Sequence, residues 1–290
     1  EVDDFAEETL AGEEPKERTI TLFDYQPVHV QLHGTVLRGE DGVAIGALIV
    51  TSDVTRIKRL ETVRREFVAN VSHELRTPIT SILGFVETLQ EGALEQPDRA
   101  LRFLDIIYAH ANRLNLIIED LLSLSRLESY EATIPVQKCQ IHEIINSTKL
   151  SVAPAAMQKN IDVDDSYSGP TEVMANATLL EQAIKNLVDN AVKYSPENTV
   201  VRLSVRNRDG ALTVTVSDEG IGIPAADLPR IFERFYRVDR ARSRDLGGTG
   251  LGLAIVKHIA IAHGGNVNVE SNPGAGSRFI LTIPQNWDAS

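Results

Sequence analysis

The sequence predicts a multidomain chain in which a small β-sheet leads into a long helical hairpin and then into an α+β domain. Short β-branched runs lie within residues 19–50, and apolar residues recur at threes and fours over residues 55–129. After residue 136, helical and strand patterns mix without strict alternation. With 290 residues and 42% hydrophobic content, the chain is long and apolar enough for two or three domains.

The N-terminal part is expected to be an acidic segment followed by a small sheet. Residues 1–18 are acidic and poor in large apolar side chains, which predicts a loose helix or tail. A hairpin turn is expected at residues 39–42. The three strand patterns cover residues 19–22, 28–37 and 45–50.

The exit from the third strand, IVTSDVT at residues 49–55, resembles the last strand and Asp-x-Thr ending of PAS domains. We therefore identify residues 19–54 as the C-terminal part of a PAS-like domain. Three strands suffice for a small sheet but not for a full sensory domain, so the resemblance leaves ligand binding open. A plain β-meander is the alternative.

Two long amphipathic helices are predicted next, at residues 55–90 and from the turn at 91–97 to about residue 129. The apolar stripe of the first helix contains Leu60, Phe67, Val71, Leu75, Ile79, Ile82, Val86 and Leu89. The inner side of the second contains Leu104, Ile107, Leu114, Ile117, Leu121, Leu124 and Leu127. Because such a hairpin cannot cover its own stripe, we expect a homodimer in which two hairpins form a four-helix bundle.

His73 lies outside this stripe. At the helical spacing it points about 160° away from Val71 and Leu75, so it is expected to face water. An imidazole held on a rigid helix beside the carboxylate of Glu74 is placed to attack a group brought to it. The alternative is a surface histidine without a chemical role. Pro78 removes a backbone donor one turn later and is expected to kink or loosen the helix, a defect that simple packing does not require.

Beyond residue 136 the pattern predicts an α+β domain rather than a Rossmann sheet. Helices are expected near residues 141–157, 178–194 and 251–263. Strands are expected near residues 160–164, 199–206, 211–217, 266–270 and 277–283.

The second of these helices carries a polar face. Asn186, Asn190 and Lys193 are spaced by four and three residues, so they share one side of the helix. Mg²⁺ accepts an amide oxygen and keeps its waters, while a lysine neutralises phosphate charge. The face therefore suits a hydrated metal ion and a polyphosphate, with a solvated polar stripe as the alternative.

Two glycine-containing segments suit a nucleotide. Asp218 follows a predicted strand and could accept a hydrogen bond from an exocyclic amine such as that of adenine. Gly220 and Gly222 let the backbone approach a flat ligand. Residues 247–253 (GGTGLGL) open a helix, where free backbone N–H groups attract phosphate. The pattern matches neither a P-loop nor a dinucleotide-binding glycine loop.

Between these segments, residues 231–237 (IFERFYR) and 238–246 predict an aromatic clamp and an arginine-rich lid. Ordinary packing accounts for most of the expected role of Phe232 and Phe235. The arginines expected to help neutralise phosphate, with a solvated face as the alternative, are Arg237, Arg240, Arg242 and Arg244.

Residues 67–80 (FVANVSHELRTPIT) resemble the H box of sensor histidine kinases. The four segments from residue 186 to 253 resemble, in order, the N, G1, F and G2 boxes of the Bergerat ATP-binding fold, and residues 274–279 (GAGSRF) look like its closing glycine turn. The implied fold is a partial PAS-like β-sheet, a helical hairpin forming a dimeric four-helix bundle, and an α+β Bergerat ATP-binding sandwich. The implied nucleotide-binding residues are Asn186, Asn190, Lys193, Tyr194, Asp218, Gly220, Gly222, Ile223, Phe235, Arg237, Gly248, Thr249, Gly250, Leu251 and Gly252.

This resemblance implies ATP and Mg²⁺ as cofactors. Asn190 would hold Mg²⁺, Asn186 and Lys193 the phosphates, and Asp218 the adenine amine. The implied domains are an acidic segment (1–18), the PAS-like part (19–54), a dimerisation and phosphotransfer hairpin (55–130), a linker (131–135) and a catalytic ATP-binding domain (136–290).

The implied function is that of an ATP-dependent protein-histidine kinase, most similar in spacing to phosphate-regulon and cell-wall sensor kinases. His73 would be the nucleophile, Glu74 would take or orient its proton, and an aspartate of a response-regulator receiver domain would receive the phosphoryl group. Glu74 and Thr77 would form a Glu-x-x-Thr phosphatase signature. The alternatives are another Bergerat-fold ATPase, which leaves His73 without a role, and a non-catalytic regulator-binding scaffold, which should have lost box residues.

Composition excludes other classes. A net charge of −12 and a pI near 5.1 argue against nucleic acid as a partner. A single cysteine, Cys139, excludes an internal disulfide and is expected to be a partly buried structural thiol. The longest apolar run, residues 43–50, is far short of the ~20 residues that span a bilayer. We expect a cytoplasmic portion of a membrane sensor kinase, with any membrane anchor in an upstream segment.

Overall fold

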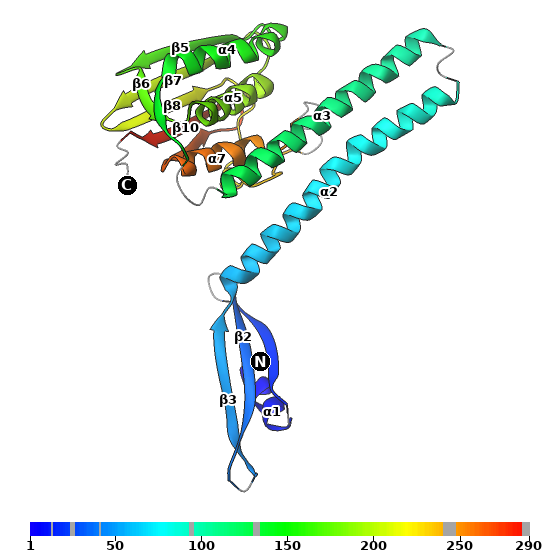
Figure 1. The fold of residues 1–290 in the computed structure, drawn as a ribbon, viewed down its shortest axis with the longest axis vertical. Helices are drawn as coiled ribbons and strands as arrows, with labels where there is room; N and C mark the ends of the chain where they lie inside the picture. Colours follow the sequence, from blue (N-terminus) through cyan, green and yellow to red (C-terminus); the bar gives the residue numbers. More distant parts are fainter. Residues whose placement is uncertain are drawn as a thin grey trace. The chain divides into compact units, whose positions relative to one another are not determined.

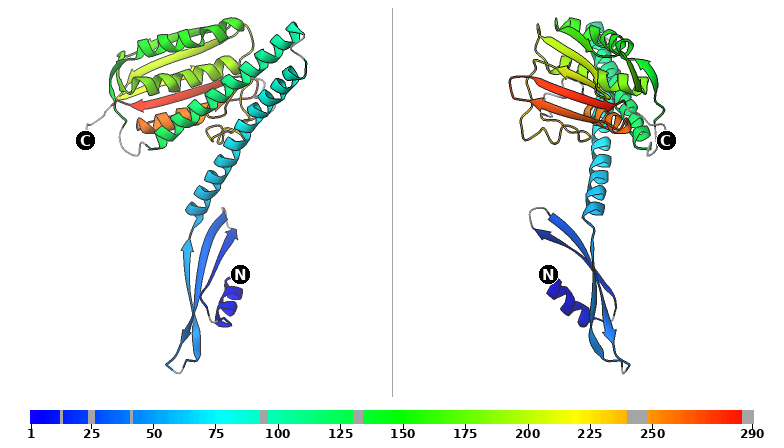
Figure 2. Two further views of the ribbon diagram at one scale, coloured as in Figure 1. Left: turned by 45° about the vertical axis from the view of Figure 1, so that its right-hand side comes forward. Right: turned by 90° about the vertical axis from the view of Figure 1, so that its left-hand side faces the viewer.

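The computed structural model of the chain describes residues 1–12, 14–23, 27–40, 42–92, 96–129, 134–239 and 248–285. It divides into two compact units, residues Glu1–Ser72 and His73–Ser290. Figures 1 and 2 show the elements of each unit.

The first unit contains a short helix and a three-stranded antiparallel sheet. Helix α1 (Val2–Leu10) precedes β1 (Lys16–Phe23), β2 (Pro27–Arg38) and β3 (Ala44–Asp53), which pair in the order β1-β2-β3. The three strands were predicted. The acidic segment is more ordered than expected, because Phe5 of α1 packs against Ile20 and Leu32 of the sheet. The first strand also begins at Lys16 rather than residue 19.

The Asp-x-Thr ending ties this sheet to the helix that follows. Asp53 Oδ1 accepts a hydrogen bond from the backbone N–H of Thr55 (2.9 Å), and Thr55 Oγ1 accepts one from the N–H of His29 in β2 (2.9 Å). The start of α2 (Thr55–Gln90) is therefore held by the middle strand of the sheet. This contact is compatible with the PAS-like interpretation of the strands.

Helices α2 and α3 (Pro97–Ser129) form the predicted hairpin. Near the turn, Leu89 and Ala100 are buried with Phe103 and Ile107 packed against them. Helix α2 continues through Pro78, which is buried, so the expected defect does not end the helix. A single chain leaves much of the apolar surface uncovered. The exposed residues include Leu60, Val68, Ile79, Leu83, Leu101, Leu104, Tyr108, Leu116 and Leu122.

The described part of the α+β domain is a helical layer on a five-stranded sheet. The sheet order is β5-β7-β8-β10-β9, with β5 parallel to β7 and the other neighbours antiparallel. The helices α4 (Ile141–Gln158), α5 (Ala177–Tyr194) and α7 (Gly252–Ala262) cover one face of it, as Figure 2 shows. The strands are β5 (Asp162–Ser168), β7 (Val200–Arg208), β8 (Ala211–Ser217), β9 (Asn266–Ser271) and β10 (Ser277–Pro284).

The alternation of buried and partly exposed residues along these strands explains why helices pack against one side of the sheet only. In β8, Leu212, Val214 and Val216 are buried while the residues between them are partly exposed. The matching face of α5 buries Leu180, Ile184 and Leu187. A period of two on the strand and of three or four on the helix gives one shared apolar core.

Two sequence predictions in this domain need correction. The strand predicted at 160–164 begins at Asp162, because Asn160 adopts a positive φ of 51° in the turn after α4. A short sheet of β4 (Gln137–Gln140) and β6 (Glu172–Ala175) was only partly anticipated, through the strand-like run around Cys139. Cys139 is half-buried there, with its thiol 3.6 Å from the carbonyl oxygen of Val173, as expected of a structural thiol.

Candidate active site

His73 lies on α2 with an exposed side chain, as the face argument predicted. The neighbouring carboxylate has partners that the sequence did not suggest. Glu74 Oε2 lies 3.0 Å from the guanidinium of Arg113 on α3 and 3.6 Å from that of Arg237. The side chains of Glu74 and Arg113 are 20% and 17% exposed, so little water screens the pair. In this arrangement Glu74 is held by two cations.

Thr77 lies one turn after His73 and is also exposed. Its hydroxyl donates a hydrogen bond to the backbone carbonyl of His73 (3.1 Å). This is the common bond of a helical threonine to the carbonyl four residues earlier. The hydroxyl must leave that carbonyl before it can donate to a docked partner.

The polar face of α5 approaches the glycine segment that opens α7. Asn186 Nδ2 donates to the carbonyl of Gly252 (3.3 Å), and the ammonium of Lys193 fills the space where a Cβ of residue 248 would lie. Asn190 lies between these two residues in the sequence and is partly buried. Within the described residues its side-chain amide makes no hydrogen bond. The structure therefore brings Asn186 and Lys193 to the glycine segment that was predicted to bind phosphate, and it leaves the Asn190 amide available for a ligand.

The amine of Lys193 has a lowered pKa. Burial of its amine, followed by the positive charges of Arg237 and Arg113, lowers the pKa of Lys193 to about 8. Such crowding of cations around a half-buried amine is costly without an anion. A polyphosphate at this position would relieve it.

Asp218 follows β8 and closes a tight loop. Its Oδ1 accepts hydrogen bonds from the backbone N–H groups of Gly220 (2.8 Å) and Ser277 (3.1 Å). Its Oδ2 makes no hydrogen bond within the described residues. Burial raises the pKa of Asp218, although these two hydrogen bonds oppose the rise. The oriented carboxyl thus keeps one oxygen for a ligand amine.

Close backbone packing explains the glycines of this loop. A Cβ at Gly220 would lie 2.8 Å from the carbonyl oxygen of Tyr194, at the end of α5. Gly222 has a φ of 69°, and a Cβ there would overlap the carbonyl of Asn272. The N–H of Ile223 donates to Ser271 Oγ (2.9 Å), which fixes the loop on β9. The Asp218 loop is therefore locked against both α5 and the closing turn.

The second glycine loop is held by Phe235 and Arg237. The N–H of Phe235 donates to the carbonyl of Gly250 (2.8 Å), and Phe235 is buried in the left-handed region with φ 62°. Arg237 donates to the carbonyl of Gly248. Gly250 has a φ of 75°, and a Cβ there would lie 3.0 Å from Phe235 Cα. Phe232 makes an edge contact with Phe279, the ordinary packing expected of it.

Thr249 and Leu251 stand at the N-terminal end of α7. Thr249 Oγ1 accepts a hydrogen bond from the N–H of Leu251 (3.2 Å) and donates one to Asp120 Oδ2 on α3 (2.6 Å). Burial raises the pKa of Asp120. A carboxylate thus lies at a helix end that favours anions.

Some expected site residues are not part of this geometry. Arg240, Arg242, Arg244 and Gly247 lie outside the described residues. Sequence reasoning also missed Arg113 and Asp120, because nothing in the pattern of α3 distinguishes them from other polar positions of an amphipathic helix.

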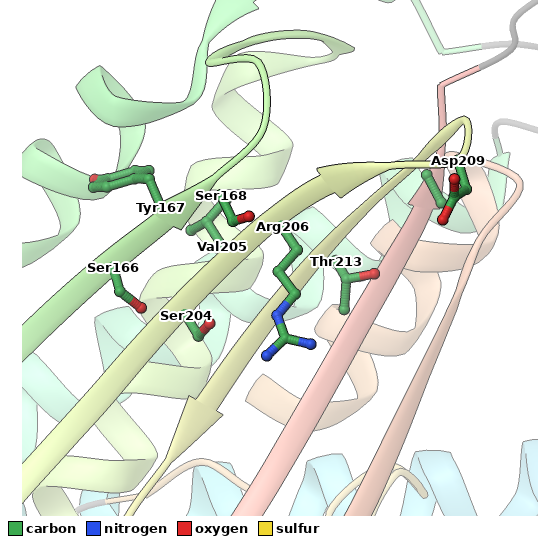
Figure 3. Close-up of a pocket in the computed structure, with 9 residues that line it drawn as sticks. Ser166, Tyr167, Ser168, Ser204, Val205, Arg206, Asp209 and Thr213 are labelled. Carbon is green, nitrogen blue, oxygen red and sulfur yellow. The ribbon is translucent and has the colours of Figure 1, made fainter.

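A hollow of about 780 Å³ lies elsewhere, over β5, β7 and β8 (Figure 3). Its lining is mostly hydroxyl groups, and none of the predicted site residues contributes to it. The lining residues are Ser166, Tyr167, Ser168, Ser204, Val205, Arg206, Asp209, Ala211 and Thr213. We assign the candidate site to the α5, Asp218 and α7 segments, because Asn186, Lys193 and the oriented Asp218 carboxyl lie there.

Comparison with known families identifies the class of two parts of the chain. The family described as "His Kinase A (phospho-acceptor) domain" matches residues 63–130. The family described as "Histidine kinase-, DNA gyrase B-, and HSP90-like ATPase" matches residues 175–286. The second match defines the class of the nucleotide domain, and the two together, in this order, define a histidine kinase core.

Similar proteins identify the family. The sensor-like histidine kinase SenX3 of Mycolicibacterium smegmatis is 42% identical, over 82% of this chain and 62% of that protein. SenX3 of Mycobacterium tuberculosis is 38% identical, over 96% of this chain and 68% of that protein. Other relatives are named WalK and PhoR sensor kinases. The chain belongs to the sensor histidine kinase family, and it spans about two thirds of the length of the SenX3 relatives.

The fold is shared with solved histidine kinases. Full-length ShkA in complex with AMPPNP has a TM-score of 0.57 and 29% identity, covering 76% of this chain and 45% of that one. In the part of the chain that the structure describes, no helix has the length and apolar character needed to cross a membrane.

The lowered pKa of Lys193 gives a pH prediction. Only the protonated amine attracts phosphate, so Mg-ATP affinity should fall as pH rises through about 8. At pH 9 about one tenth of the free protein would carry the protonated amine, which predicts close to tenfold weaker binding than at pH 7. Calorimetric titration at several pH values measures this.

Lys193→Met should bind more weakly at pH 7 and lose this pH dependence. Lys185→Met is the matched control, because Lys185 is an exposed lysine of the same helix. If the Mg-ATP affinity of Lys193→Met falls with rising pH as steeply as that of the wild type, Lys193 does not contact the phosphates.

Proposed function

We propose that this chain is the kinase core of a two-component system, which uses ATP to phosphorylate His73 and passes the phosphoryl group to an aspartate of a response regulator. The observation that carries the proposal is the convergence of Asn186 and Lys193 of α5 on the glycine loop that opens α7, with the oriented Asp218 carboxyl on the neighbouring loop. An exposed histidine on a matched phospho-acceptor helix supplies the nucleophile.

The proposed nucleotide contacts follow from the donors and acceptors present. Asp218 Oδ2 accepts from the adenine amine, and Tyr194 lines the base pocket beside Gly220. Asn186, Lys193 and Arg237 neutralise and orient the phosphates, together with backbone N–H groups at the start of α7. In ShkA the solved complex holds the ATP analogue AMPPNP, which supports an adenine nucleotide as the ligand here.

Mg²⁺ fits the residues present. Asn190 offers a partly buried amide without another partner among the described residues, and an amide oxygen is a suitable ligand for a hard ion that keeps its waters. The described residues contain no cluster of three His, Cys, Asp or Glu side chains that could hold a metal. The ion would therefore be held by Asn190 and the nucleotide phosphates, and would supply charge neutralisation there.

The proposed reaction is phosphoryl transfer with little covalent work for the protein. A nitrogen lone pair of His73 attacks the γ-phosphorus, the bond to the β,γ-bridging oxygen breaks, and ADP leaves. Glu74 orients or accepts the proton of the other ring nitrogen. Since two arginines hold Glu74 in this structure, we infer that Arg237 must release it when it turns to the phosphates.

The exposed apolar residues of α2 and α3 support a further proposal. A second copy would cover part of this surface in a four-helix bundle, so we propose a homodimer, which a monomer in sedimentation at micromolar concentration would contradict. The surface around His73 then remains for the receiver domain.

The division proposed for the chain is 1–18, 19–54, 55–130, 131–135 and 136–290. Because ATP is an intracellular donor, we place this chain in the cytoplasm.

Two other functions are less well supported. A different ATPase of the same fold would leave an exposed histidine on a matched phospho-acceptor hairpin without a use. A non-catalytic scaffold would have no reason to keep the Asp218 carboxyl, the α5 amides and the glycine loops together.

The kinase proposal is tested by the chemistry of the product. Incubation with Mg-ATP should give a phosphoryl group that is labile in acid and stable in alkali, because it is a phosphoramidate. His73→Gln should abolish this product and leave Mg-ATP affinity unchanged. Label that persists on His73→Gln would place the acceptor elsewhere.

The proposed phosphatase activity depends on the Thr77 hydroxyl. Thr77→Ala should keep autophosphorylation but slow dephosphorylation of a receiver domain that accepts phosphate from the wild-type chain, by about tenfold for one well-placed hydrogen bond. Thr77→Ser keeps the hydroxyl and should retain the activity. Equal rates for all three proteins would mean that Thr77 only bonds to the backbone of its own helix.

A further inference from the structure

Helix α5 ends without the usual backbone cap. Ser195 follows the last helical residue in an extended conformation, with φ −80° and ψ 146°, and precedes Pro196. A residue before proline is held in extended conformations, so the chain cannot enter the left-handed turn that commonly satisfies the last carbonyls. The N–H of Ser195 reaches the carbonyl of Ala191 (3.1 Å), and the remaining carbonyls need donors from elsewhere.

Lys159 supplies those donors from a distant part of the sequence. Its ammonium donates to the backbone carbonyls of Val192 (2.9 Å), Lys193 (2.7 Å) and Ser195 (3.0 Å). An ammonium has three N–H donors, so these contacts use all of them. Its charge also lies at the negative end of the helix dipole, where a cation is stabilising.

The position of Lys159 is itself fixed by the backbone. It follows the last residue of α4, its N–H donates to the carbonyl of Ala156 (3.1 Å), and its carbonyl accepts from the N–H of Asn198 (3.0 Å). Asn160 Nδ2 donates to Asn198 Oδ1 (2.7 Å). The turn after α4 and the segment after α5 are thus joined, and the ammonium is held between them.

The turn that Lys159 caps carries the nucleotide site. The Lys193 side chain fills the space beside Gly248, and the Tyr194 carbonyl lies against Gly220. A small movement of this turn would therefore change the fit of both glycine loops. The charge of Lys159 also contributes to lowering the pKa of Lys193.

We propose that Lys159 is a positioning residue for nucleotide binding, which acts by holding the last turn of α5 between the two glycine loops. This inference rests on the proposed ATP site. Lys159 does not touch the nucleotide in the proposal, and its effect is on the placement of Lys193 and Tyr194.

The test is the affinity of the full chain for Mg-ATP, measured by calorimetry well below the melting temperature. Lys159→Met keeps the length of the side chain and removes all three donors, so we expect about tenfold weaker binding. Lys159→Gln keeps two donors without the charge and should lie between Lys159→Met and wild type. Autophosphorylation at saturating ATP should change much less than the affinity, because the chemical groups remain.

Lys149→Met is the matched control. Lys149 is a partly buried lysine of α4, the helix that Lys159 follows, and it pairs with Asp165 rather than with α5. It should change Mg-ATP affinity by no more than about twofold, even if it lowers the melting temperature.

The outcomes separate the two proposals. Lower melting temperature with wild-type affinity in Lys159→Met would overturn the positioning role and leave a stabilising one. If Lys159→Met does not fold, wild-type affinity in Lys159→Gln would overturn it equally. Failure of the wild-type chain to bind Mg-ATP would instead refute the proposed function.

Discussion

The proposed nucleotide site depends on the contacts of the last turn of α5. Two loops from distant parts of the chain approach it closely. At Gly220 a Cβ would meet the Tyr194 carbonyl, so this position needs a glycine, and beside Gly248 the Lys193 ammonium fills the space that a Cβ would take. Since Pro196 prevents an ordinary helix cap, the turn is completed by Lys159. One helix end thereby contacts both the Asp218 loop and the loop that opens α7.

Cationic side chains lie close together in the same region, and a bound anion would stabilise them. Burial lowers the pKa of Lys193, and the nearby charges of Arg237 and Arg113 lower it further. Glu74 neutralises part of this charge by pairing with both arginines. Arg237 therefore contacts both Glu74, which follows His73, and the carbonyl of Gly248 in the proposed phosphate loop.

Local patterns allowed most of the fold to be predicted. The hairpin was evident from apolar spacing in α2 and α3, and the main sheet from alternation such as that of β8. The exposure of His73 followed from helix geometry alone. The four-residue strand β6 was missed because it pairs with β4, about 35 residues earlier, and carries no periodic signal of its own. Asn160, whose positive φ delays β5, donates a side-chain hydrogen bond to Asn198, 38 residues later, and no local pattern predicts this contact.

The functional contacts of the candidate site were less predictable for the same reason. Motif spacing indicated Asn186, Lys193 and Asp218, but Lys159, Arg113 and Asp120 act across long sequence separations and belong to no motif.

The central claim is that the Asp218 carboxyl recognises an adenine nucleotide, and Mg-ATP titration of Asp218→Asn tests it most directly. We predict a loss of about 1.5–3 kcal/mol in binding free energy, as expected for a hydrogen bond to a charged group. Unchanged affinity would contradict the account and place the nucleotide elsewhere.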